Sequence, residues 1–235
     1  MYLSFFSLSG RVISYFVFLK VKDRSMNAKV AVVTVSGKAY YMLVDELKRR
    51  NMAFLSLTPQ DEVPLGLEVV ITTKEESALI RHPNVLIFED VKDPAVVVDE
   101  AVRLIRGKDC YETIIMGVDP GKTTGIAVLA DADVIEAFTV SGLRCAARSI
   151  LELSKRAKAK ENIVKVGDGA PIYSKELLHL LDKNLSEEYT IETVSEAGTN
   201  RPFGDGSCRR VARDAMATVR IAERKGRLFP RGNMP

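Results

Sequence analysis

Hydrophobic residues in the first half of the chain alternate between short continuous runs and helical spacing. Residues 29–36 (KVAVVTVS) form a valine-rich run of the kind found in a buried strand. A later segment begins with Asp93 and Pro94, which suit the N-cap and the first turn of a helix. The pattern predicts strands at 29–36, 54–57, 67–72 and 84–88 and helices at 38–50 and 93–106. Strands that alternate with helices predict a small Rossmann-like domain with a parallel sheet over residues 27–108.

The second half shows a different order of elements. Three strands follow one another closely, as in a meander, and helices then alternate with two further strands. The predicted strands are 113–119, 124–129, 134–140, 163–166 and 190–195, and the predicted helices are 143–158, 174–181 and 207–225. This order predicts an α/β domain with a mixed sheet over residues 111–235. In it the first, fourth and fifth strands are expected to be parallel neighbours.

The first 26 residues form a separate problem. Residues 1–20 are apolar and aromatic, but Arg11 interrupts them, and the longest uncharged run is well short of the ~20 residues that a membrane span requires. There is no basic segment before the run and no clear cleavage site. We interpret residues 1–26 as an extension ahead of a natural start at Met26, with a weak signal or anchor as the alternative.

Composition narrows the class of protein only modestly. Hydrophobic residues make up 46% and charged residues 28% of the chain, which is typical of a globular protein. The net charge of +3 is too small to indicate nucleic acid by itself. The three cysteines form no CxxC pair, which disfavours a structural zinc site and fits the cytoplasm. His82 and His179 lack metal-binding or triad spacing, so hydrolysis that depends on histidine is disfavoured.

The sequence DPGKTTG at 119–125 is the most informative stretch for function. It is not a Walker A loop, because Gly117 precedes Gly121 by one residue too few. An apolar strand instead ends in Asp119, and a Pro-Gly turn sends the next strand back antiparallel. Gly125 lets that strand approach a ligand closely. By contrast, Gly37 follows the first predicted strand as an ordinary turn, and residues 27–106 do not disclose a function.

The stretch GVDPGKTTGIAVL resembles the first motif of the RuvC/YqgF branch of ribonuclease-H-like proteins. Residues 166–181 and 194–200 resemble the GNG and SEAG motifs of the YqgF-like domain in Tex transcription-accessory proteins, and residues 209–217 resemble the last helix of the superfamily. Four motifs in the correct order cover about half of the chain. The resemblance implies a ribonuclease-H-like fold for the mixed-sheet domain. The chain departs from the Tex pattern at Asp168, where that pattern has asparagine.

Four acids are predicted to converge at one edge of the mixed sheet. Asp119, Asp168 and Glu196 each follow one of the three parallel strands, which are ~4.8 Å apart, and Asp214 joins from the last helix. Such carboxylates repel one another unless a cation is bound, and Mg²⁺ or Mn²⁺ prefers oxygen ligands. We therefore predict that these four residues hold divalent metal and are catalytic. Asp205 is interpreted as a turn residue only.

Basic residues surround these acids in the sequence. The C-terminal segment is rich in arginine, and Lys122 lies in the turn after Asp119. Phosphate groups of nucleic acid are the expected partners of such residues. The predicted nucleic-acid-binding residues are Lys122, Arg209, Arg210, Arg213 and Arg220. A second cluster, Lys155 to Lys160, is equally well explained as a solvated helix end.

Three functions are compatible with these features. The first is a metal-dependent nuclease that cleaves phosphodiester bonds in structured DNA or RNA. The second is a non-catalytic nucleic-acid-binding module with a ribonuclease-H-like fold, which the Tex resemblance permits. An actin-like ATPase is the third, but it needs two such domains, and only one fits after Asp119. The sequence predicts no membrane partner, leaves a homodimer open, and does not distinguish DNA from RNA.

Overall fold

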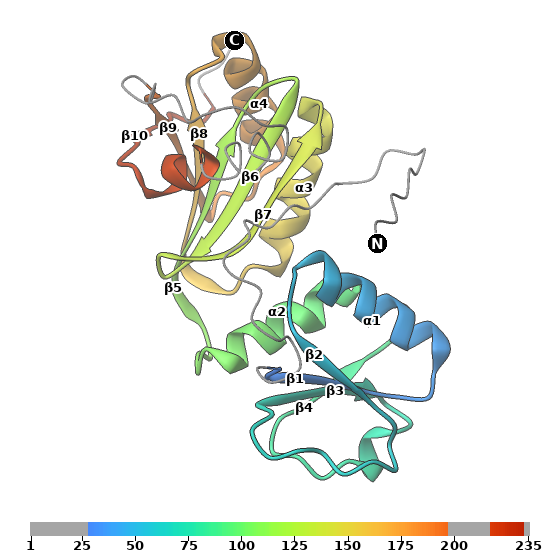
Figure 1. Ribbon diagram of the computed structural model, residues 1–235. Helices are drawn as coiled ribbons and strands as arrows, with labels where there is room; N and C mark the ends of the chain where they lie inside the picture. The colour runs from blue at the N-terminus through green and yellow to red at the C-terminus, as the bar shows by residue number, and fades with distance from the viewer. Residues whose placement is uncertain (1–27, 197–216, 233–235) are drawn as a thin grey trace, which may run out of the picture.

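The computed structural model describes residues 28–196 and 217–232, which form two α/β units (Figure 1). The N-terminal unit, residues 28–106, contains a four-stranded parallel sheet in the order β2-β1-β3-β4. Both of its long helices pack on one face of this sheet, and loop residues cover the other face. Its elements are β1 (Val30–Val33), α1 (Gly37–Arg49), β2 (Phe54–Leu57), β3 (Val69–Thr73), a 3-10 turn η1 (Ser77–Leu79), β4 (Val85–Phe88) and α2 (Pro94–Ile105).

The second unit contains a six-stranded mixed sheet in the order β10-β9-β8-β5-β6-β7. Strands β5, β8 and β9 are parallel neighbours, whereas β6 is antiparallel to β5 and to β7. Its elements are β5 (Tyr111–Asp119), β6 (Thr123–Ala130), β7 (Asp133–Ser141), α3 (Leu143–Arg156), β8 (Ala159–Gly167), α4 (Pro171–Asn184), β9 (Tyr189–Val194) and β10 (Arg227–Leu228). The predicted fold class, a parallel-sheet domain followed by a mixed-sheet domain, is confirmed.

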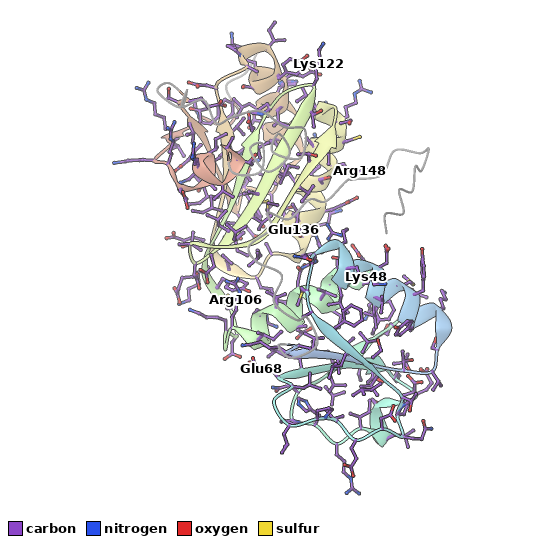
Figure 2. The ribbon with its side chains drawn as sticks, viewed as in Figure 1. Lys48, Glu68, Arg106, Lys122, Glu136 and Arg148 are labelled. Atoms are coloured by element: carbon purple, nitrogen blue, oxygen red, sulfur yellow. The ribbon has the colours of Figure 1, made fainter. Side chains whose placement is uncertain are left out.

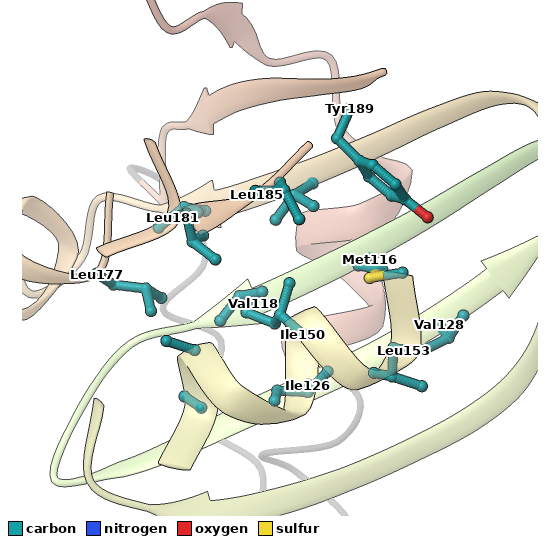
Figure 3. Close-up of a cluster of buried hydrophobic side chains, with 14 of the residues drawn as sticks. Met116, Val118, Ile126, Val128, Ile150, Leu153, Leu177, Leu181, Leu185 and Tyr189 are labelled. Atoms are coloured by element: carbon teal, nitrogen blue, oxygen red, sulfur yellow. The ribbon is translucent and has the colours of Figure 1, made fainter. Parts of the chain in front are cut away.

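The main core of the mixed sheet lies between the sheet and helices α3 and α4 (Figure 3). Met116 and Ile126 from the sheet meet Ile150 from α3 and Leu177 from α4, and all four side chains are fully buried. Burying one such side chain contributes about 1.5–3 kcal/mol. The opposite face packs against a C-terminal helix, which the structure describes over residues 217–223. Both faces of the central strand are therefore covered.

Some boundaries differ from the sequence prediction. Strand β8 begins at Ala159 rather than Ile163, because its polar first residues pair with β5 from Tyr111 onward. Helix α4 begins at Pro171, which suits a first helical position, rather than at Ser174. Strand β10 was not predicted. Residues 1–26 and residues 207–216 of the predicted last helix lie outside the described part of the chain. Among the described residues, no helix is long and apolar enough to cross a bilayer.

Ion pairs join the two units where the end of α1 meets strand β7. Arg49 pairs with Glu46 of its own helix and with Glu136 of β7, at 2.7 and 2.6 Å. Glu136 faces the N-terminal unit in Figure 2. Arg50, almost fully buried, contacts Glu46 and Asp99 at 2.5 Å each. These alternating charges form a buried network that fixes the contact between the units.

Glu46 makes this network sensitive to acid. Burial by itself raises the pKa of the Glu46 carboxyl. Arg49 and Arg50 lower it by more than burial raises it, so the pKa falls from an ordinary 4.5 to about 2. A carboxyl whose pKa is lowered by folding stabilises the fold at any pH above its pKa in the unfolded chain. This stabilisation is lost as the pH falls from about 4.5 towards 2.

We expect Glu46→Gln to lower the free energy of unfolding by about 3 kcal/mol at neutral pH, and by much less near pH 3. Denaturant titrations at both pH values measure this difference. Glu75→Gln, at an exposed position, is the matched control and is expected to change stability little. Equal losses for Glu46→Gln at the two pH values would contradict the role of the charge.

Candidate functional site

Two of the predicted acids lie next to the same glycine at the C-terminal edge of the mixed sheet. Val118 of β5 pairs with Val166 of β8, so Asp119 lies beside Gly167 in the adjacent strand. Asp119 and Gly117 face the same side of the sheet, because alternate residues of a strand share a face. A Cβ atom at Gly167 or Gly169 would overlap the Glu196 carboxylate, so this carboxylate lies directly over the two glycines. Asp119 and Glu196 therefore approach one spot above Gly167.

Asp168 and Glu196 hold each other's loops through backbone hydrogen bonds. The Glu196 amide donates to Oδ1 of Asp168 at 2.9 Å, and the Gly169 amide donates to Oε1 of Glu196 at 3.1 Å. The Asp168 amide continues the sheet by donating to the carbonyl of Val194. One oxygen of each carboxylate thus has a structural role, which fixes both side chains at the sheet edge.

The C-terminal helix lies against the strand that ends in Asp119. A Cβ atom at Gly117 would come within 2.6 Å of the Thr218 carbonyl oxygen and 2.8 Å of the Ala222 Cβ, so the helix requires glycine there. Thr218 and Ile221 are buried on this side. The sequence placed Asp214 on the same helical face as these two residues, but Asp214 itself lies outside the described range.

A basic side chain in the sheet fastens the end of this helix. Lys165 of β8 is buried, and its Nζ donates to the carbonyls of Ala222 and Arg224 at 2.9 and 2.6 Å. The last helical carbonyls have no partners within the helix, so this lysine satisfies them and complements the helix dipole. Arg224 in turn donates to the Ser195 carbonyl at 2.8 Å, next to Glu196.

A pocket of about 140 Å³ opens between the loop after β9 and the C-terminal helix. The Glu196 side chain and two arginines line it, together with Ala217 and Ile221. Arg220, a predicted phosphate ligand, is exposed at this pocket. Arg224 is the second arginine; it belongs to the basic C-terminal segment expected to contact phosphate, but it is not one of the five named binding residues. The remaining predicted arginines, Arg209, Arg210 and Arg213, are outside the described residues.

The donor set suits a hard divalent cation, because Asp119, Asp168 and Glu196 offer only oxygen atoms. In residues 28–196 and 217–232, however, no three His, Cys, Asp or Glu side chains lie close enough together to hold a metal ion. The geometry provides a pair of acids over Gly167, and a third ligand must come from elsewhere in the chain, from substrate or from water.

Further basic side chains lie at the same end of the sheet. Lys122 is exposed at the tip of the β5–β6 hairpin (Figure 2), and its carbonyl accepts from the Gly142 amide at the start of α3. Arg144 and Arg148 follow on the exposed side of α3. The described part of the chain gives these three cations no ion-pair partner. The sequence prediction missed both arginines, although their spacing of four residues puts them on one helical face.

The alternative basic cluster of residues 155–160 is partly neutralised. Arg156 lies 3.2 Å from Asp99 in α2, and Lys160 pairs with Glu112 at 2.8 Å. Two of the four basic residues of this cluster are thus paired with acids.

Residues 29–105, which include the whole N-terminal sheet and its two helices, match the family model of the response regulator receiver-like domain. The match covers about a third of the chain and none of the mixed sheet. The chain matches no curated protein. The candidate site lies entirely outside the matched residues.

The tight contact at Gly117 predicts a specific effect of a single methyl group. Gly117→Ala would drive Cβ into the backbone of the C-terminal helix, and overpacking of this kind costs about 1–3 kcal/mol. Gly37→Ala is the matched control, because a Cβ at Gly37 meets no atom within 4 Å. Denaturant unfolding of both variants measures the difference. Equal stabilities would show that the helix does not press on β5.

Proposed function

We propose that residues 111–235 form a metal-dependent nuclease domain of the RuvC/YqgF type, which cleaves phosphodiester bonds in structured DNA or RNA. The main support is the convergence of Asp119 and Glu196 over Gly167, beneath a helix that carries arginines. The strand order of the mixed sheet also agrees with the ribonuclease-H-like fold that the sequence motifs imply.

In this proposal each side chain has a defined task. Magnesium or manganese, when bound, supplies an activated water and stabilises the leaving oxygen of the phosphodiester. Asp119 and Glu196 supply the negative charge that holds the cation, Asp168 positions the Glu196 backbone, and Asp214 is the fourth predicted ligand. Lys122 and Arg220 contact phosphate oxygens, and Arg209, Arg210 and Arg213 extend this contact surface.

The second candidate is a non-catalytic nucleic-acid-binding module. It is favoured by the backbone hydrogen bonds of Asp168 and Glu196, and by the lack of a three-residue metal group in the described segments. Both candidates require the basic surface, and only the first requires the metal. Metal-dependent cleavage therefore separates them.

Asp119→Asn is expected to reduce Mg²⁺- or Mn²⁺-dependent cleavage of labelled branched and single-stranded substrates by ~10³-fold, which is roughly 4 kcal/mol of transition-state stabilisation. The substitution keeps the shape of the side chain and removes its charge. Asp45→Asn, at an exposed position of α1, removes the same charge far from the site and should cleave like wild type.

A thermal scan with and without the metal checks the same site by a second measurement. Only the native state binds the cation strongly, so the metal should raise the melting temperature of wild type more than that of Asp119→Asn. Cleavage by Asp119→Asn within a few-fold of wild type would exclude this active site. Equal metal-induced shifts would favour the binding module.

The phosphate contacts predict a change in salt dependence. Neutralising Lys122 and Arg220 together, both to Gln, should flatten the slope of log affinity against log salt by up to ~1.8 for duplex DNA, at about 0.9 per phosphate contact. Binding should weaken alike for all sequences, because phosphate contacts carry no sequence information.

The matched control for this salt titration is Lys48→Gln with Lys74→Gln, two exposed lysines of the N-terminal unit. This pair changes the net charge equally, and the slope should remain that of wild type. If the two double variants show the same slope, Lys122 and Arg220 do not contact phosphate.

A further inference from the structure

The peptide unit that leads into Glu196 is held by charged side chains on both of its polar atoms. Its carbonyl, which belongs to Ser195, accepts a hydrogen bond from Nη1 of Arg224 at 2.8 Å. Its amide, which belongs to Glu196, donates to Oδ1 of Asp168 at 2.9 Å. Hydrogen bonds with an ionised partner are stronger than those between neutral groups. The loop after β8 and the end of the C-terminal helix thus hold this one peptide between them.

The backbone of Arg224 is itself fixed by the mixed sheet. Buried Lys165 of β8 donates from Nζ to the Arg224 carbonyl at 2.6 Å, and the same Nζ lies 3.9 Å from Oε2 of Glu192 in β9. A Cβ atom at Gly226 would come within 2.6 Å of Oε2 of Glu192, so the chain after Arg224 runs directly against this carboxylate. Two strands of the sheet therefore determine the point from which the Arg224 side chain reaches Ser195.

The two arginines at the pocket beside Glu196 differ in their contacts. Arg220 and Arg224 are four residues apart and both line this pocket. Arg220 is exposed, and within residues 28–196 and 217–232 it forms no hydrogen bond or ion pair, which suits the phosphate contact proposed for it. Arg224 is half-buried and already donates to a backbone carbonyl. The two side chains therefore suit different tasks at the same site.

We propose that Arg224 is a positioning residue for the Glu196 carboxylate. It holds the peptide before Glu196 against Asp168 and so keeps the Glu196 side chain over Gly167. The role of this carboxylate as a metal ligand rests on the proposed nuclease function, whereas its positioning by Arg224 does not. Residues that orient a metal ligand change metal affinity by about 10–100-fold when they are replaced.

Amide hydrogen exchange of the metal-free full chain measures the positioning directly. Arg224→Met keeps an unbranched apolar side chain but removes the donor to Ser195. The amides of Glu196 and Gly169, whose acceptors are the two carboxylates at this edge, should then exchange about tenfold faster, because their loops open more often. The amide of Met116, in the buried middle of β5, should exchange as in wild type and so report that the fold is intact.

Titration with Mn²⁺ alone and a salt titration of DNA binding separate positioning from phosphate contact. Arg224→Met should bind Mn²⁺ about tenfold more weakly. Its slope of log affinity against log salt should equal that of wild type, whereas Arg220→Gln should flatten the slope by about 0.9. Lys225→Met, at the exposed next residue, makes the same charge change and should match wild type in exchange and in Mn²⁺ affinity. Arg224→Lys keeps a charged donor on a shorter side chain and should fall between Arg224→Met and wild type.

Wild-type exchange rates at Glu196 and Gly169 in Arg224→Met would overturn the proposal. A flatter salt slope with unchanged Mn²⁺ affinity would also overturn it and would make Arg224 a phosphate ligand instead. If wild type itself binds no Mn²⁺, the proposed metal site fails. In that case the exchange rates still decide whether Arg224 positions Glu196, because they are measured without metal.

Discussion

Strand β5 is the element on which the mixed-sheet unit depends. It is hydrogen-bonded to β6 on one side and to β8 on the other, and both of its faces are covered by helices. A strand in this position must present large apolar side chains to one face, as Met116 and Val118 do. The other face admits only a small residue where a helix passes close by, which is Gly117. The strand ends at Asp119, at the edge of the sheet where the candidate site lies.

The sequence was sufficient to predict helices and strands whose own residues have a clear hydrophobic pattern. Phe54–Leu57 is a short, mostly apolar run, and the helix from Leu143 has a strong apolar face, so both were predicted at their correct starts. The first residues of β8 are Ala-Lys-Glu-Asn, which have no strand-like alternation. They are extended because Tyr111 and Thr113 of β5 pair with them. Strand β10 is only two residues long and exists through its pairing with β9.

The candidate site was predictable to a similar depth. Parallel order alone brings Asp119 and the residues after β8 and β9 to one edge, so the acids could be located from element order. The position of the Glu196 carboxylate could not be predicted, because the carboxylate occupies space that a side chain at Gly167 or Gly169 would fill. The contact between Arg49 and Glu136 was equally hidden, since 87 residues separate the partners and neither has a distinctive local pattern.

Lys165 helps to fix the pairing register of strand β8 in the mixed sheet. It is the one basic residue in the buried part of β8, between Val164 and Val166, which face the opposite side among the packed side chains of α3 and α4. Sliding β8 by a single position would exchange these faces and place an ammonium group in hydrocarbon, far from the helical carbonyls that now hold it. An unpaired buried charge costs several kcal/mol, so misaligned pairings are strongly disfavoured during folding. A residue that fastens a helix in the native state thus also makes its nearest competitors unstable.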